Sequence, residues 1–207
     1  MFMTDNLTDK LLPNKCKKIV FKYSRLFCDV ERFKEKSKET MSEKGMGVIY
    51  TNDCFEQITM PNKKYEKTII KSYYDKHHKK LDKITTQMLN KDKCIIIDFH
   101  SFSDEMVYKL LNIKDSPDIC IGTDQIYTPP ELLNFTLNFF KKYGYSVKEN
   151  YPYSGTIVPS KFMKKHNNKL SSIMIEINKR VYLNDKKKYL KLKKCIEDYN
   201  EAIKESF

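Results

Sequence analysis

The apolar positions of the chain form short runs separated by polar stretches, a pattern typical of an α/β protein. The clearest run, CIIID at 94–98, predicts a strand covered on both faces of a mostly parallel sheet. We expect this strand to end before His100. Loops beyond the carboxyl ends of such strands converge over a crevice, which makes His100 a functional candidate, although a buried histidine satisfied by its neighbours fits the position equally well. Ser101 and Ser103 both suit the N-cap of the helix expected next.

Further strands are predicted where short apolar runs end at turn residues, at 17–23, 48–51, 118–124, 145–150 and 171–182. In the last of these, a period of two places Glu176, Asn178 and Arg180 on one face. A glutamate among apolar residues is costly to bury unless it is paired or used. We therefore expect a functional role for Glu176, with Arg180 as its structural partner.

Helices are predicted at about 65–90, after Ser103, at 128–144 and at 186–207, where apolar residues recur at three- and four-residue steps. Thr128 is the expected N-cap of the third helix and Gly144 its end. The adjacent His77 and His78 of the first helix point about 100° apart and do not easily bind one metal together. The polar stretch 52–63, with Pro61, is expected to form turns.

The length of 207 residues suits one domain, 1–207, and no apolar run is long enough to cross a bilayer. The first ten residues lack a signal-peptide pattern. Six scattered cysteines without a CxxC pair indicate buried thiols in a reducing cytoplasm. The chain contains no GxGxxG, P-loop, HExxH or GxSxG motif.

The net charge of +12 raises the question of nucleic-acid binding. Only three of the 39 basic residues are arginines, and lysines are spread along almost every segment. Specific nucleic-acid readers more usually carry clustered arginines or an aromatic and basic motif. We therefore expect no specific nucleic-acid partner, and we read the charge as a lysine-rich solvated surface.

Two of the three arginines, Arg25 and Arg32, lie in one half-apolar segment with Asp29 and Glu31. One interpretation is an internal cluster of ion pairs. The other is that at least one guanidinium faces the crevice and binds a substrate carboxylate through a bidentate fork. The residues alone slightly favour the ion pairs.

Seven segments in order resemble the N-formylglutamate amidohydrolase (deformylase) family over about residues 4–185. They are SRLFCDVERF at 24–33, GMGVIYT at 45–51, YYDKHHKKL at 73–81, IIIDFHSF at 95–102, PDICIGTD at 117–124, GYSVKENYPYSGTIVP at 144–159 and SIMIEINKRVYL at 172–183. Each segment alone is a weak signal, but seven in family order are specific.

The resemblance implies a mixed, mostly parallel sheet flanked by helices, similar to the zinc carboxypeptidases (a phosphorylase/hydrolase-like fold). It also implies zinc-dependent hydrolysis of N-formyl-L-glutamate, or of a related N-acyl amino acid, to formate and glutamate. By motif, His100 would be a zinc ligand and Glu176 the general base. The substrate, a small acidic molecule, would be bound by Arg25, Arg32, Asn150, Tyr153 and Arg180. Further candidates for the site are His78, Asp98 and Ser101.

Members of this family normally begin with a segment that carries a His-Ser-Gly or His-Ala-Gly motif. Here no histidine precedes His77. Since a catalytic zinc takes three protein ligands, Asp5, Asp9, His78 or Glu176 would have to join His100. We expect either a longer protein upstream, with a further N-terminal strand, or a catalytically incomplete member that binds an acidic small molecule.

Overall fold

The computed structural model describes residues 3–35, 37, 39–52 and 63–207. The chain divides into two compact units: unit 1 comprises residues 1–18, 93–158 and 166–207, and unit 2 comprises residues 19–92 and 159–165. The positions of the two units relative to one another are not determined, and each is described by itself.

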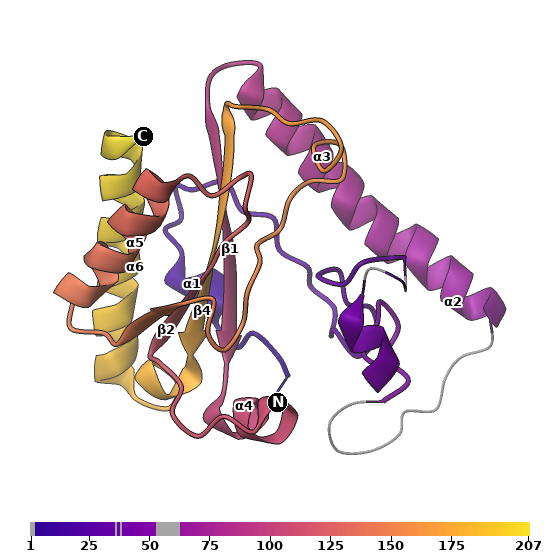
Figure 1. Ribbon diagram of the computed structural model, residues 1–207, viewed down its shortest axis with the longest axis horizontal. Coiled ribbons are helices and arrows are strands. Elements are labelled where there is room, and N and C mark those ends of the chain that lie inside the picture. Colours follow the sequence, from indigo (N-terminus) through magenta and orange to yellow (C-terminus); the bar gives the residue numbers. More distant parts are fainter. Residues whose placement is uncertain (1–2, 36, 38, 53–62) are drawn as a thin grey trace. The chain divides into compact units, whose positions relative to one another are not determined.

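Unit 1 contains a four-stranded mixed sheet in the order β1-β4-β2-β3 (Figure 1). Its strands are β1 (Cys94–Phe102), β2 (Ile119–Gly122), β3 (Val147–Glu149) and β4 (Leu170–Asn178). β1 pairs with β4 and β2 with β3 in parallel, whereas β2 and β4 are antiparallel. This sheet confirms the predicted mixed, mostly parallel α/β fold.

Helices flank the sheet of unit 1. They are α1 (Thr8–Leu11), α4 (Asp104–Leu111), α5 (Pro130–Lys142), the 3-10 helix η4 (Lys179–Val181) and α6 (Lys186–Ser206). α5 and α6 lie side by side (Figure 1), and buried residues of both belong to one core with β2 and β4. The predicted helices at 128–144 and 186–207 are therefore present with shifts of only a few residues.

The two faces of the sheet differ in chemistry because side chains alternate along each strand. One face carries the isoleucines Ile173, Ile175 and Ile177 of β4 with Ile119 and Ile121 of β2, all fully buried in the core that includes α5 and α6. The other face carries the intervening residues of β4, which are polar except for Leu170 and Met174. Packing of the apolar face therefore decides which side chains gather on the polar face.

β1 is longer than predicted, which corrects the position of His100. The strand runs to Phe102, so His100 and Ser101 lie within it and not in a turn beyond it. Nine consecutive residues pair with β4, so the pairing continues past Asp98 to Phe102. Ser103 is the N-cap of α4, since its side chain accepts a hydrogen bond from the Met106 amide, and Ser101 is not.

β4 is shorter than predicted, which corrects the position of Arg180. The strand ends at Asn178, whose side chain accepts the Arg180 amide and begins η4. Arg180 therefore does not continue the strand face of Glu176. The N-cap prediction for α5 was also wrong: Pro129 holds that position, and the Thr128 hydroxyl instead donates to the Ser172 carbonyl oxygen at 2.6 Å.

The named elements of unit 2 among the described residues are helical. They are η2 (Thr40–Lys44), α2 (Lys63–Ile69), the π-helical turn η3 (Ile70–Tyr74) and α3 (Asp75–Leu89). The last three follow one another directly and confirm the predicted helix at 65–90. The predicted turns at 52–63 lie almost wholly outside the described residues.

The strands predicted at 17–23 and 48–51 are wrong, because the chain forms no strand there, although an isolated bridge joins Met46 and Tyr50. Their side chains pack instead. Val48 belongs to a buried cluster with Cys28, Val30, Ile69 and Tyr74. The Phe21 and Tyr23 rings pack against each other with their centroids 5.5 Å apart.

Cys28, Cys94, Cys120 and Cys195 are buried free thiols, as predicted, whereas Cys16 is only half-buried and Cys54 lies outside the described residues. Within the part of the chain that the structure describes, no helix has both the length and the apolar character to cross a bilayer.

Gly122, at the end of β2, provides a test of packing beside the polar face. A Cβ at this position would overlap the Gly155 carbonyl oxygen and the Met174 side chain. We expect Gly122→Ala to lower the free energy of unfolding by about 1–3 kcal/mol, measured by urea denaturation. Gly47→Ala is the matched control, since its new methyl group would meet only the Ser42 side chain at 3.1 Å, and equal losses in the two variants would contradict this account.

Candidate functional site

Three adjacent strands bring a histidine, a glutamate and a cysteine into one row on the polar face of the sheet. Glu176 of β4 pairs with His100 of β1 on one side and with Cys120 of β2 on the other. Directly paired residues project from the same face. His100 and the half-buried Glu176 are therefore neighbouring residues on this face, although 76 positions separate them in the numbering.

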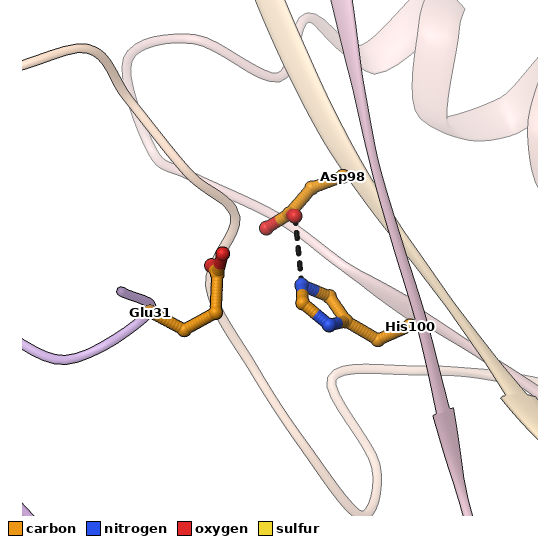
Figure 2. A group of neighbouring side chains, drawn as sticks. All are labelled: Glu31, Asp98 and His100. Carbon is orange, nitrogen blue, oxygen red and sulfur yellow. Dashed lines mark hydrogen bonds and ion pairs between the residues drawn. The ribbon is translucent and has the colours of Figure 1, made fainter. Parts of the chain in front are cut away.

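Asp98 lies two residues before His100 on the same strand face and contacts its ring. The Asp98 Oδ1 atom is 2.7 Å from His100 Nε2 (Figure 2), and the two side chains are only 10% and 13% exposed. The second oxygen, Oδ2, accepts the Ile157 amide at 2.9 Å. Glu31, drawn in the same figure, belongs to unit 2.

Asp5 contacts the other ring nitrogen of His100. Its Oδ2 atom lies 3.4 Å from Nδ1, while its Oδ1 atom accepts the Ser101 amide at 2.6 Å and the Ser101 hydroxyl at 3.1 Å. The neighbouring Asn6 carbonyl oxygen accepts a hydrogen bond of 2.6 Å from the Tyr182 hydroxyl. The segment around Asp5 is thus bonded to both β1 and the chain beyond β4.

The donor set around His100 is suited to a cation. Ionised carboxylates are acceptors only, and a neutral imidazole carries one N–H, so Asp5, Asp98 and His100 together offer more lone pairs than protons. Imidazole nitrogen and carboxylate oxygen are also ordinary zinc ligands. Two arrangements are available: Nε2 with Asp98, or Nδ1 with Asp5.

Two neighbouring groups experience the negative charge of this site. Burial first, and the Glu176 carboxylate in addition, raise the pKa of the Cys120 thiol to about 11. Burial likewise raises the pKa of Tyr182 to about 12, with further contributions from Asp5 and Glu176. Cys120 is therefore a protonated thiol near neutral pH, unlike a cysteine nucleophile.

Arg180 joins a polar cluster at the ends of β2 and β4. Its guanidinium donates to Asp104 at 2.7 Å, to Asp118 at 3.0 Å and to the Ser116 carbonyl oxygen at 2.8 Å. Desolvation raises the pKa of Asp104, but hydrogen bonds from Ser116, Asn178 and Arg180 outweigh it and hold that pKa below its usual value. These contacts link Arg180 to two aspartates, whereas the sequence predicted Glu176 as its partner.

Asn150 and Tyr153 lie in the loop after β3. The Asn150 side chain bonds to Thr123 twice, accepting its amide and donating to its hydroxyl, and so joins the loop to the end of β2. The Tyr153 carbonyl oxygen accepts the Cys120 thiol at 3.1 Å, and its ring contacts Phe102. Tyr153 thus adjoins the polar face near the His100 row, and its role toward a substrate stays a prediction.

In unit 2, Arg25 and Arg32 both pair with one buried carboxylate. Their Nε atoms lie 3.5 and 3.4 Å from Asp29 Oδ2, and this oxygen also accepts the Tyr50 hydroxyl at 2.8 Å. Arg32 lies in addition 3.7 Å from Glu39. The ion-pair interpretation of this segment is therefore confirmed, and a role for either arginine toward a substrate stays a prediction.

His78 binds the chain segment that carries Arg32. Its Nε2 atom is 2.8 Å from the Val30 carbonyl oxygen, and Tyr74, one helical turn earlier, donates to the Arg32 carbonyl oxygen at 2.8 Å. Nε2 therefore carries the proton. The other nitrogen, Nδ1, is buried and has no hydrogen-bond partner among the described residues.

Asp98 and Ser101 were predicted as additional site residues. Asp98 contacts the His100 ring, and Ser101, the next residue of β1, binds Asp5. The sequence singled out Asp5 less clearly, because it is an acidic residue in a polar segment. It was one of four side chains that could join His100 as a metal ligand. Its contact with β1 spans 96 positions, and no local pattern predicts such a pairing.

The partial burial of His78 leads us to expect that the stability of the fold depends on pH. Desolvation lowers the pKa of His78 below its ordinary value of 6.5, so the unfolded state binds more protons as the pH falls below that value. His78 thus stabilises the fold above pH 6.5, and this contribution is lost as the pH falls through its folded-state pKa. We expect His78→Gln to reduce the loss of stability between about pH 7.5 and 5, measured by urea denaturation.

The variant His166→Gln, at an exposed histidine, is the control and should keep the pH dependence of the wild type. If His78→Gln and the wild type lose stability equally over this range, His78 is not the titrating group.

Comparisons with known proteins bear on the identity of this fold. Residues 2–183 match the family model of N-formylglutamate amidohydrolase. The crystal structure of N-formylglutamate amidohydrolase from Ralstonia eutropha is similar, with a TM-score of 0.71, 17% identity and coverage of 88% of this chain and 76% of that chain. A gene product from Agrobacterium tumefaciens has a TM-score of 0.62, 18% identity and coverage of 88% and 69%.

No curated protein sequence matches the chain. At these identities the two structures establish the fold alone, whereas the family match spans most of the sequence and agrees with the motifs found in it. The chain therefore belongs to the N-formylglutamate amidohydrolase family.

Proposed function

We propose that this protein is a metal-dependent amidohydrolase that cleaves N-formyl-L-glutamate, or a related N-acyl amino acid, to formate and the free amino acid. The observation that carries the proposal is the register of β1 against β4, which pairs His100 with Glu176. A cation ligand and a carboxylate base are thereby neighbours on rigid strands. Family membership supports the amide as the bond that is cleaved.

In this proposal His100 holds zinc together with a carboxylate beside it. Zinc, when bound, supplies a Lewis acid and lowers the pKa of a bound water molecule toward 7. Glu176 is the general base: it takes a proton at a carboxylate oxygen and delivers it to the leaving nitrogen. Its Oε2 atom is buried on the polar face of the sheet, away from bulk water.

The proposed substrate carries carboxylates, for which the candidates remain Arg25, Arg32 and Arg180. Asn150 and Tyr153 are proposed to shape the pocket. The ion pairs of Arg25 and Arg32 with Asp29 fix the orientation of both side chains before any ligand binds. Such preorganisation lowers the entropic cost of binding.

Replacement of the general base gives the most direct test. We expect Glu176→Gln to lower kcat for N-formyl-L-glutamate hydrolysis by about 100- to 10,000-fold with little change in KM, because the amide keeps the shape but does not accept the proton. Formate release measures the rate. Glu131→Gln, at an exposed position in the first turn of α5, is the matched control and should keep wild-type activity.

Turnover in Glu176→Gln equal to that of the wild type, with an intact fold, would exclude this mechanism. Wild-type protein that binds glutamate derivatives but never releases formate would instead indicate a binding member of the family.

A lysine substitution separates the substrate-binding and structural roles of Arg25. Arg25→Lys keeps the positive charge near Asp29 but loses the planar fork. We expect KM to rise about tenfold, equivalent to ~1.4 kcal/mol, with the melting temperature close to that of the wild type. Lys22→Met, which removes an exposed cation three residues away, should leave both unchanged. A lower melting temperature with unchanged KM would assign Arg25 to the structure alone.

A further inference from the structure

We propose that Asp5 is a cation ligand together with Nδ1 of His100, and that Asp98 orients the His100 ring by accepting its Nε2–H. The inference rests on the proposed function, since it assigns ligands within the same site. It chooses between the two arrangements that the donor set offers, and it gives a chemical role to a residue far from His100 in the sequence.

The two distances at the imidazole separate these roles. Two donors at about 2.0–2.1 Å from a tetrahedral zinc lie about 3.3 Å apart. The distance of 3.4 Å between Asp5 Oδ2 and His100 Nδ1 agrees with two ligands of one ion. The distance of 2.7 Å between Asp98 Oδ1 and Nε2 is too short for that geometry and is typical of a charge-assisted hydrogen bond.

The protonation of the ring leads to the same assignment. When Nε2–H donates to Asp98, the neutral imidazole presents a lone pair at Nδ1. This lone pair and the Asp5 Oδ2 atom face each other across 3.4 Å, an arrangement that a cation between them stabilises. Histidine ligands commonly donate their other ring N–H to a carboxylate, which is the role we assign to Asp98.

Asp5 is itself held in the orientation that a ligand requires. Its Oδ1 atom accepts the Ser101 amide and hydroxyl, so Oδ2 is the oxygen turned toward His100. The Tyr182 hydroxyl holds the next residue through the Asn6 carbonyl oxygen. Carboxylates that bind a metal are typically held by hydrogen bonds from neighbouring protein groups in this way.

Zinc affinity, measured by chelator competition on the full chain, tests the assignment. We expect Asp5→Asn to weaken zinc binding by more than about 100-fold, beyond the range typical of residues that only orient a ligand, and Asp98→Asn to weaken it by about 10- to 100-fold. Asp9→Asn is the matched control: it removes a charge in the same segment, where Asp9 pairs with Lys10, and should bind zinc like the wild type.

A thiolate at position 5 gives a readout independent of activity. We expect Asp5→Cys loaded with Cd²⁺ to show a cadmium–thiolate charge-transfer band in the difference spectrum against the wild type. This band requires a direct bond between the new sulfur atom and the metal. Asp9→Cys should show no such band. In the zinc-loaded wild type, ¹⁵N shifts of the His100 ring should report zinc at Nδ1 and a proton at Nε2.

The outcomes separate this inference from the proposed function. If Asp5→Asn binds zinc and hydrolyses the substrate like the wild type, or if zinc is found at Nε2 of His100, the ligand assignment is overturned and the metal-dependent function stands. If the wild type binds no zinc and hydrolyses nothing, both are overturned. A melting temperature for metal-free Asp5→Asn near that of the wild type shows that lost zinc affinity does not arise from unfolding.

Discussion

The parallel pairing of β1 with β4 is the interaction on which the rest of unit 1 depends. β4 also pairs with β2, so it is an inner strand of the sheet, and its isoleucines are buried in the core that includes α5 and α6. A slip of one residue would turn these isoleucines toward the polar face and Glu176 into the core. The hydrophobic effect therefore fixes the register, and the register sets Glu176 beside His100.

Local patterns predicted much of this fold. The apolar run at 94–98, the helix over 65–90 and the two later helices all exist, and Gly144 has the positive φ expected after a helix. Strand ends were less predictable, because pairing with a partner strand carried β1 past Asp98 to Phe102. The strands predicted in unit 2 failed because their apolar residues pack in clusters without forming a sheet.

In the candidate site too, features encoded by local sequence were predictable, whereas contacts between distant segments were not. His100 was singled out because it follows the apolar run at 94–98, and Glu176 because a glutamate is unusual within an apolar strand. The partners of Arg180 depend on the end of β4, and the contact between Asp5 and His100 depends on a segment 95 positions away. Such contacts follow from tertiary structure, and no periodicity within one segment encodes them.

Asp98 uses its two oxygens for two different parts of the chain. One oxygen binds the His100 ring and the other the Ile157 amide, which lies four residues beyond Tyr153. Because both bonds end on one planar carboxylate, a rotation of that group moves both partners. The loop that carries Tyr153 and the imidazole thus share one anchoring carboxylate, so the orientation of the ring and the position of the loop are set by the same side chain.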